Sequence, residues 1–138
     1  MPRILLAEDN PADVYLIREA LTEHGVDYPV RVAADGRDVL KFLSDVESQS
    51  GNQDLSLIIL DLNLPLHDGI EILQRLRQTP SLGTVPVVIL TSSDSPRDRI
   101  VASELGAACY LRKPSSLDQF LGLGAVFKSL LGAEKQSG

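Results

Sequence analysis

The sequence predicts an α/β fold in which a five-stranded parallel sheet carries helices on both of its faces. Five short apolar stretches alternate with longer segments whose apolar residues recur at helical spacing. Several of the short stretches are apolar at every position, as strands covered on both faces should be. Five strand–helix alternations are typical of a parallel sheet with crossover helices, and a chain of 138 residues has room for one such domain.

The expected strands are the five apolar stretches, residues 4–7, 30–34, 55–60, 86–90 and 108–111. Each is far shorter than the roughly 18 apolar residues that a membrane span needs, so no membrane segment is expected. Glu8 and Asp9 interrupt the first stretch after a few residues, which excludes a signal peptide at this position.

The first two expected helices have clear boundary signals. Asn10 is a capping residue, Pro11 follows it at the first helical position, and Asp13 is an anion in the first turn, where the helix dipole favours negative charge. Gly25 is a suitable terminator of this helix. A second helix begins near Gly36, and its apolar residues 39, 40, 43 and 46 form one face.

The other three helices are expected after the third, fourth and fifth strands. The third begins at Gly69, the fourth has Ser95 as its cap, and the last follows Ser116. Gly122 and Gly124 lie inside the last helix and each weakens it by about 1 kcal/mol relative to Ala, so this helix must depend on packing. Residues 1–132 are expected to form the domain, with a polar surface loop at 47–54 and a disordered tail at 133–138.

Charge and cysteine content exclude several classes of function. Thirteen Lys and Arg against nineteen Asp and Glu give a net charge of −6, which argues against nucleic acid or an anionic membrane as the main partner. Cys109 is the one cysteine, so no internal disulfide or multi-cysteine zinc site is expected, and we interpret it as a buried core thiol. The expected compartment is the cytoplasm. With two histidines, a bound metal is expected to be a hard cation with oxygen ligands.

Polar residues follow four of the five expected strands, at the edge of the sheet where ligands bind in open α/β folds. They are Glu8 and Asp9 after the first strand, Asp61 after the third, Thr91 and Ser92 after the fourth, and Lys113 and Pro114 after the fifth. Each alone has an ordinary explanation as a cap, turn or surface residue. Their joint position at successive strand ends favours a functional site.

Three clustered carboxylates repel one another unless a cation neutralises them. Mg²⁺ binds a few carboxylates and keeps several waters, which leaves positions for a phosphoryl oxygen. The Thr91 hydroxyl and the Lys113 ammonium could contact the other phosphoryl oxygens. Asp61 is then placed to attack phosphorus, since a carboxylate can form an aspartyl phosphate.

The set Glu8-Asp9, Asp61, Thr91 and Lys113-Pro114 resembles the receiver domain of two-component response regulators, over nearly the whole chain. The segments DNPADVYLI at 9–17, DLNLP at 61–65 and ACYL at 108–111 look like the single-domain regulators paired with bacterial and cyanobacterial phytochromes. The resemblance implies the flavodoxin-like receiver fold and a signalling protein that catalyses its own phosphorylation and dephosphorylation without turning over a separate substrate.

The resemblance also implies a role for each residue. Asp61 would take the phosphoryl group from a phosphohistidine of a sensor histidine kinase, and Asp9, Glu8 through water, Asp61 and the backbone carbonyl of Asn63 would bind Mg²⁺, for which Mn²⁺ could substitute. Thr91 would move toward the phosphoryl group and Tyr110 would follow it as the aromatic switch. Lys113 would pair with the phosphoryl group, its bond to Pro114 is often cis in such domains, and Ser92 keeps the pocket open.

Partners follow from the same resemblance. They are the sensor kinase, a downstream target or phosphotransfer protein, and a second copy of the chain bound through the face of the fourth helix, fifth strand and fifth helix. Glu8 departs from the family, in which the first acidic residue is most often aspartate, and this change bears on metal affinity. The Arg97-Asp98-Arg99 cluster is interpreted as an exposed helix face.

Three other functions are the alternatives to this interpretation. A flavodoxin-like FMN carrier would need a Ser/Thr/Gly-rich phosphate loop after the first strand, where Glu8, Asp9 and Asn10 would repel the phosphate. A Mg²⁺-dependent phosphatase with an aspartyl nucleophile shares the chemistry but usually needs a lid domain. A receiver that only scaffolds a complex is disfavoured by an intact set of site residues.

Overall fold

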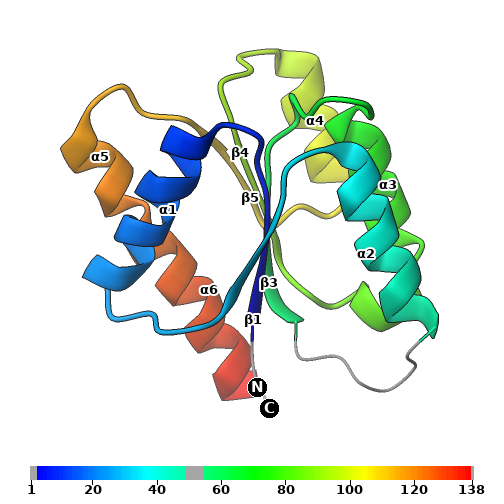
Figure 1. Ribbon diagram of the computed structural model, residues 1–138, viewed down its shortest axis with the longest axis horizontal. Helices are drawn as coiled ribbons and strands as arrows, with labels where there is room; N and C mark the ends of the chain where they lie inside the picture. Colours follow the sequence, from blue (N-terminus) through cyan, green and yellow to red (C-terminus); the bar gives the residue numbers. More distant parts are fainter. Residues whose placement is uncertain (1–2, 49–54, 138) are drawn as a thin grey trace.

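The computed structural model describes residues 3–48 and 55–137, and these form one five-stranded parallel sheet between two layers of helices (Figure 1). The strand order is β2-β1-β3-β4-β5, with every neighbouring pair parallel. The strands are β1 (Arg3–Ala7), β2 (Val30–Ala33), β3 (Leu55–Leu60), β4 (Val87–Thr91) and β5 (Cys109–Arg112). The predicted fold is confirmed, and the strand ends differ from the predicted ones by one residue at most.

The helices divide between the two faces of the sheet. Figure 1 shows α1, α5 and α6 on one face and α2, α3 and α4 on the other. Their bounds are α1 (Pro11–Glu23), α2 (Gly36–Ser48), α3 (Gly69–Arg77), α4 (Pro96–Glu104), α5 (Leu117–Gly122) and α6 (Gly124–Ser137), with a short 3₁₀ helix η1 (Pro80–Leu82) before β4. Of the polar loop expected at 47–54, the first two residues end α2 and the rest lie outside the described residues. None of the described helices has the length and apolar character needed to cross a bilayer.

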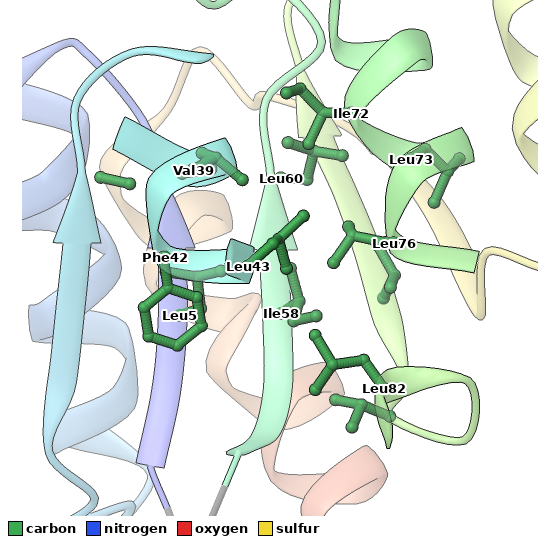
Figure 2. Close-up of a cluster of buried hydrophobic side chains, with 14 of the residues drawn as sticks. Leu5, Val39, Phe42, Leu43, Ile58, Leu60, Ile72, Leu73, Leu76 and Leu82 are labelled. Carbon is green, nitrogen blue, oxygen red and sulfur yellow. The ribbon is translucent and has the colours of Figure 1, made fainter. Parts of the chain in front are cut away.

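Alternating side chains of each strand supply two separate apolar cores. Figure 2 shows the first, in which Ile58 and Leu60 of β3 pack with Leu43 of α2 and with Leu73 and Leu76 of α3. All five side chains are almost completely buried. Because β3 is apolar at both kinds of position, it can face this core and the opposite one at the same time.

The second core lies between the sheet and α1, α5 and α6. Ile4 and Leu6 of β1 pack here with Ile17 of α1 and with Phe120 and Phe127 of the carboxyl-terminal helices. Phe127 is completely buried. These contacts hold α1 against the sheet beside β1.

The single helix predicted after Ser116 is two helices. Leu123 separates α5 from α6, and Gly124 begins α6. A Cβ atom on Gly124 would collide with the carbonyl oxygen of Ala20 and the ring of His24, so glycine is what lets α6 start this close to α1. Packing against α1, rather than local helix propensity, therefore sets the break.

Helix α6 continues to Ser137 and so includes most of the segment for which we expected a disordered tail. Ala, Glu, Lys and Gln, which make up residues 133–136, are strong helix formers, and this accounts for the extension. The domain bounds of 1–132 stay a prediction.

Candidate functional site

Glu8 and Asp61 lie side by side because β1 and β3 are neighbours in the sheet. Ala7 of β1 pairs with Leu60 of β3, and Glu8 and Asp61 are the residues that directly follow them. The backbone N–H of Asp61 donates to the Ala7 carbonyl at 3.0 Å, which holds the two strand ends in register. Glu8 is 2% exposed and Asp61 4% exposed, whereas Asp9 is exposed. Carboxylate oxygens of Glu8, Asp9 and Asp61 all lie within 4.8 Å of one another.

Lys113 reaches the same carboxylates from the end of β5. Its backbone N–H donates to the Thr91 carbonyl at 2.8 Å, which anchors the residue beside β4. The Nζ atom lies 2.8 Å from Glu8 Oε1, 2.8 Å from Asp61 Oδ2 and 2.7 Å from Asp13 Oδ2. One ammonium group therefore bonds three carboxylates.

Burial and this ammonium group set the protonation states. Burial raises the pKa of Glu8 to about 7, against hydrogen bonds from Lys113 and from the backbone N–H of Asn10. Burial would also raise the pKa of Asp61, but hydrogen bonds from Lys113, the Asn63 backbone N–H and Thr91 outweigh it and hold that pKa below its usual value. Burial alone would lower the pKa of Lys113, and its bonds to the three carboxylates raise it instead. Of the two buried carboxylates, Asp61 is therefore the one whose charged form these contacts favour.

Thr91 and Asn63 close the other side of Asp61. The Thr91 side chain is completely buried, and its Oγ1 accepts hydrogen bonds from Asn63 Nδ2 and from the Ser93 backbone N–H, each at 3.3 Å. The backbone N–H of Asn63 donates to Asp61 Oδ1 at 2.9 Å, and its Nδ2 lies 3.5 Å from Ser92 Oγ. The Asn63 side chain is thus engaged with β4 rather than free.

Tyr110 contacts the loop that follows β4. Its hydroxyl donates to the Ser93 carbonyl at 3.3 Å, and the Arg99 guanidinium lies 4.5 Å from its ring centroid. Ser93 Oγ donates to Asp98 Oδ2 at 2.9 Å. The interpretation of residues 97–99 as an exposed helix face is therefore incomplete, because Arg99 covers Tyr110 and Asp98 is a half-buried acceptor.

The sequence left the form of the Lys113–Pro114 bond open, and it predicted that Cys109 is buried. Among the described residues no peptide bond is cis, so the Lys113–Pro114 bond is trans. The two forms of an X–Pro bond differ by only about 0.5–1 kcal/mol, and local packing decides between them. Cys109 is half-buried rather than fully buried, because β5 is an edge strand.

Asp13 is the residue of this constellation that sequence reasoning missed. We assigned it to the helix dipole alone, yet its carboxylate makes the shortest of the three bonds to Lys113. The available signal was its position in the first turn of a helix that starts two residues after Asp9, at the same end of the sheet as the other site residues.

Comparison with known proteins identifies this arrangement. Residues 4–123 match the response regulator receiver domain. The chain belongs to the response regulator receiver family. Receiver domains accept phosphoryl groups from histidine kinases and are signalling proteins rather than metabolic enzymes.

This chain matches most of one cyanobacterial relative and less than half of another. The chain is 37% identical over 131 residues to the response regulator Rcp1 of Synechocystis, covering 95% of this chain and 85% of Rcp1. It is 35% identical over 114 residues to the transcriptional regulatory protein SphR of Synechococcus elongatus, covering 81% of this chain but 43% of SphR. The chain thus spans less than half of this second relative.

Solved receiver structures resemble the present one over most of its length. The phosphorylated cyanobacterial phytochrome response regulator RcpA superposes with a TM-score of 0.83 at 33% identity, covering 94% of this chain and 93% of RcpA. The Mn²⁺-bound form of Rcp1 has a TM-score of 0.82 at 36% identity, with the same coverage of both chains. Receiver domains bind Mg²⁺ in an acidic pocket, and the three clustered carboxylates of this chain form an all-oxygen donor set of the kind that such hard cations prefer.

Proposed function

We propose that Asp61 of this chain accepts a phosphoryl group from the phosphohistidine of a partner sensor histidine kinase. In this step an Asp61 carboxylate oxygen attacks phosphorus, an O–P bond forms, and the P–N bond of the phosphohistidine breaks. The electron pair of that bond returns to the imidazole nitrogen of the kinase. The product is an aspartyl phosphate, and no separate substrate is turned over.

The observation that carries this proposal is the state of Asp61. It is a buried carboxylate whose pKa is held low, and it lies 2.8 Å from the ammonium of Lys113. A charged carboxylate is the form that can act as a nucleophile, and a fixed ammonium beside it can neutralise charge on the incoming phosphoryl oxygens.

Glu8, Asp9, Asp61 and the backbone carbonyl of Asn63 are the groups that would hold Mg²⁺, with Mn²⁺ as a substitute. The cluster of three carboxylates supports this assignment, because its charge is only partly neutralised by Lys113. When bound, the ion would supply positive charge against the phosphoryl oxygens. Glu8 enters this site as a carboxylate that must lose its proton near neutral pH, because its pKa is raised to about 7.

Thr91 and Tyr110 are the proposed switch. Thr91 Oγ1 has hydrogen-bonding partners on the Asn63 side chain and on the backbone of Ser93, and Tyr110 bonds the carbonyl of that same serine. A Thr91 hydroxyl that turns to a phosphoryl oxygen would change the contacts of Ser93 and hence those of Tyr110. Ser92 and Pro114 border the proposed pocket.

The proposed kinase is a phytochrome, by analogy with RcpA, described as a cyanobacterial phytochrome response regulator. The signal would then pass to a downstream target or a phosphotransfer protein by contact, and a homodimer would form through α4, β5 and α5. The chain would act in the cytoplasm, where the phosphohistidine of such a kinase is made from ATP.

A phosphodonor assay tests the proposal. Acetyl phosphate and Mg²⁺ should add one phosphoryl group to the protein, read by intact mass, and the Asp61→Asn variant should stay unmodified. Equal modification of the variant would show that Asp61 is not the acceptor. Continuous turnover of small phosphate esters would instead favour the phosphatase.

A further inference from the structure

The side chain of Asp13 is built into the first turn of α1 at a fixed place. Asn10 caps this helix, and its Oδ1 accepts from the backbone N–H groups of Ala12 at 2.9 Å and of Asp13 at 3.3 Å. Pro11 restricts the backbone at the first helical position. The Asp13 carboxylate, 18% exposed, therefore points from a rigid helical turn to the edge of the site.

The three carboxylates bonded to Lys113 differ in what else they are proposed to do. Glu8 and Asp61 belong to the proposed metal-binding set, and Asp61 is also the proposed phosphoryl acceptor. A lysine ammonium has three protons to donate, and in this structure each one has a carboxylate partner. If a metal ion and a phosphoryl group took up Glu8 and Asp61, Asp13 would be the carboxylate that still holds Lys113.

We propose that Asp13 is a positioning residue for phosphoryl transfer, which keeps the Lys113 ammonium directed into the site while the other two carboxylates exchange partners. This inference rests on the proposed function and extends it to a residue outside the metal and phosphoryl set. Lysine has a flexible four-carbon side chain, so without such a contact its ammonium would be spread over several positions. A catalytic charge displaced by a small distance loses much of its effect on rate.

A role in helix stability is the alternative explanation of Asp13. An acidic residue in the first turn stabilises any helix through its dipole, whether or not it contacts a lysine. The two roles differ in one respect that can be measured. A positioning residue acts through Lys113, so its removal should have no effect on phosphorylation once Lys113 is gone.

The test is a double-variant cycle on the rate of phosphorylation of Asp61 by acetyl phosphate at saturating Mg²⁺. Asp13→Ala should slow the reaction by about tenfold, the effect expected for one lost hydrogen bond to a charged group. Asp13→Asn, which keeps an acceptor oxygen, should lose less. Lys113→Met should be slower than either, and the Asp13→Ala, Lys113→Met double variant should react at the rate of Lys113→Met.

Glu19→Ala is the matched control, because it removes an exposed acid from the same helix, and it should react like the wild type. A wild-type rate in Asp13→Ala would overturn the inference. So would a double variant slower than Lys113→Met by the full Asp13→Ala factor.

Thermal unfolding in metal-free buffer separates failure of this inference from failure of the proposed function. The melting-temperature losses of Asp13→Ala and Lys113→Met should be less than additive in the double variant, because both remove the same contact. If the losses are coupled but the rates are additive, the contact is structural only and the inference fails while the proposed function stands. If the wild type is not modified at Asp61 at all, the proposed function fails, and this inference fails with it.

Discussion

Replacement of Lys113 by methionine should destabilise the metal-free protein strongly. The variant keeps the apolar stem but removes the cation that lies 2.7 to 2.8 Å from three carboxylates. Removing one partner of a buried ion pair costs about 3–5 kcal/mol of folding free energy. We expect the lower end of this range, because the Asp13 side chain is still 18% exposed to solvent. A loss of about 3 kcal/mol corresponds to a fall in melting temperature of about 10 °C for a domain of this size.

The assay is differential scanning calorimetry near pH 8 with a chelator, followed by titration with Mg²⁺. The wild type and the variant should respond differently, since a divalent ion would take over the neutralisation that Lys113 provides. Mg²⁺ should therefore raise the melting temperature of the variant by more than that of the wild type. Lys41→Met, on the exposed side of α2, is the control and should leave both values unchanged. The reasoning is refuted by a variant that melts within about 2 °C of the wild type in chelator, less than one kcal/mol for a domain of this size.

Three further predictions follow from single residues. The pKa of Glu8 is raised from 4.5 to about 7, so protonated Glu8 stabilises the fold fully below pH 4.5, and this stabilisation is lost as the pH rises through 7. The melting temperature of the metal-free wild type should therefore fall over this pH range. Glu8→Gln, which cannot titrate, should show a smaller fall. Gly124→Ala should lower the free energy of unfolding by about 1–3 kcal/mol through overlap with Ala20, whereas Gly122→Ala, with open space around it, should be neutral or stabilising in the same urea titration. Phe127→Ala should cost about 3–5 kcal/mol by urea denaturation, and a smaller loss than Gly124→Ala would contradict the assigned core.

The sheet was predictable because its strands are short and apolar on both faces. β3 and β4 are almost continuously aliphatic, and only a strand covered on both sides tolerates this composition. The break between α5 and α6 was not predictable in the same way. Gly122 and Gly124 indicated a weak helix, but the collision that requires glycine at 124 involves Ala20, which is distant in the sequence.

Some residues of the candidate site could likewise be predicted from the sequence, and others could not. Glu8, Asp61 and Thr91 could be predicted together, since strand ends of a parallel sheet meet at one edge. Asp13 could not be separated from an ordinary first-turn acid, because only the folded chain brings Lys113 to it across a hundred residues. The contact of the Asn63 side chain with Thr91 likewise depends on how the loop after β3 packs against the end of β4.

Thr91 Oγ1 accepts hydrogen bonds from Asn63 and Ser93, and the same hydroxyl group also helps to hold the pKa of Asp61 low. A hydroxyl group cannot turn its proton without also turning its lone pairs. If an anion drew this hydroxyl away from the carboxylate, we expect its contacts with Asn63 and Ser93 to change in the same movement. The Thr91 side chain is completely buried. We therefore expect it to couple the chemistry at Asp61 to the geometry of the neighbouring loops.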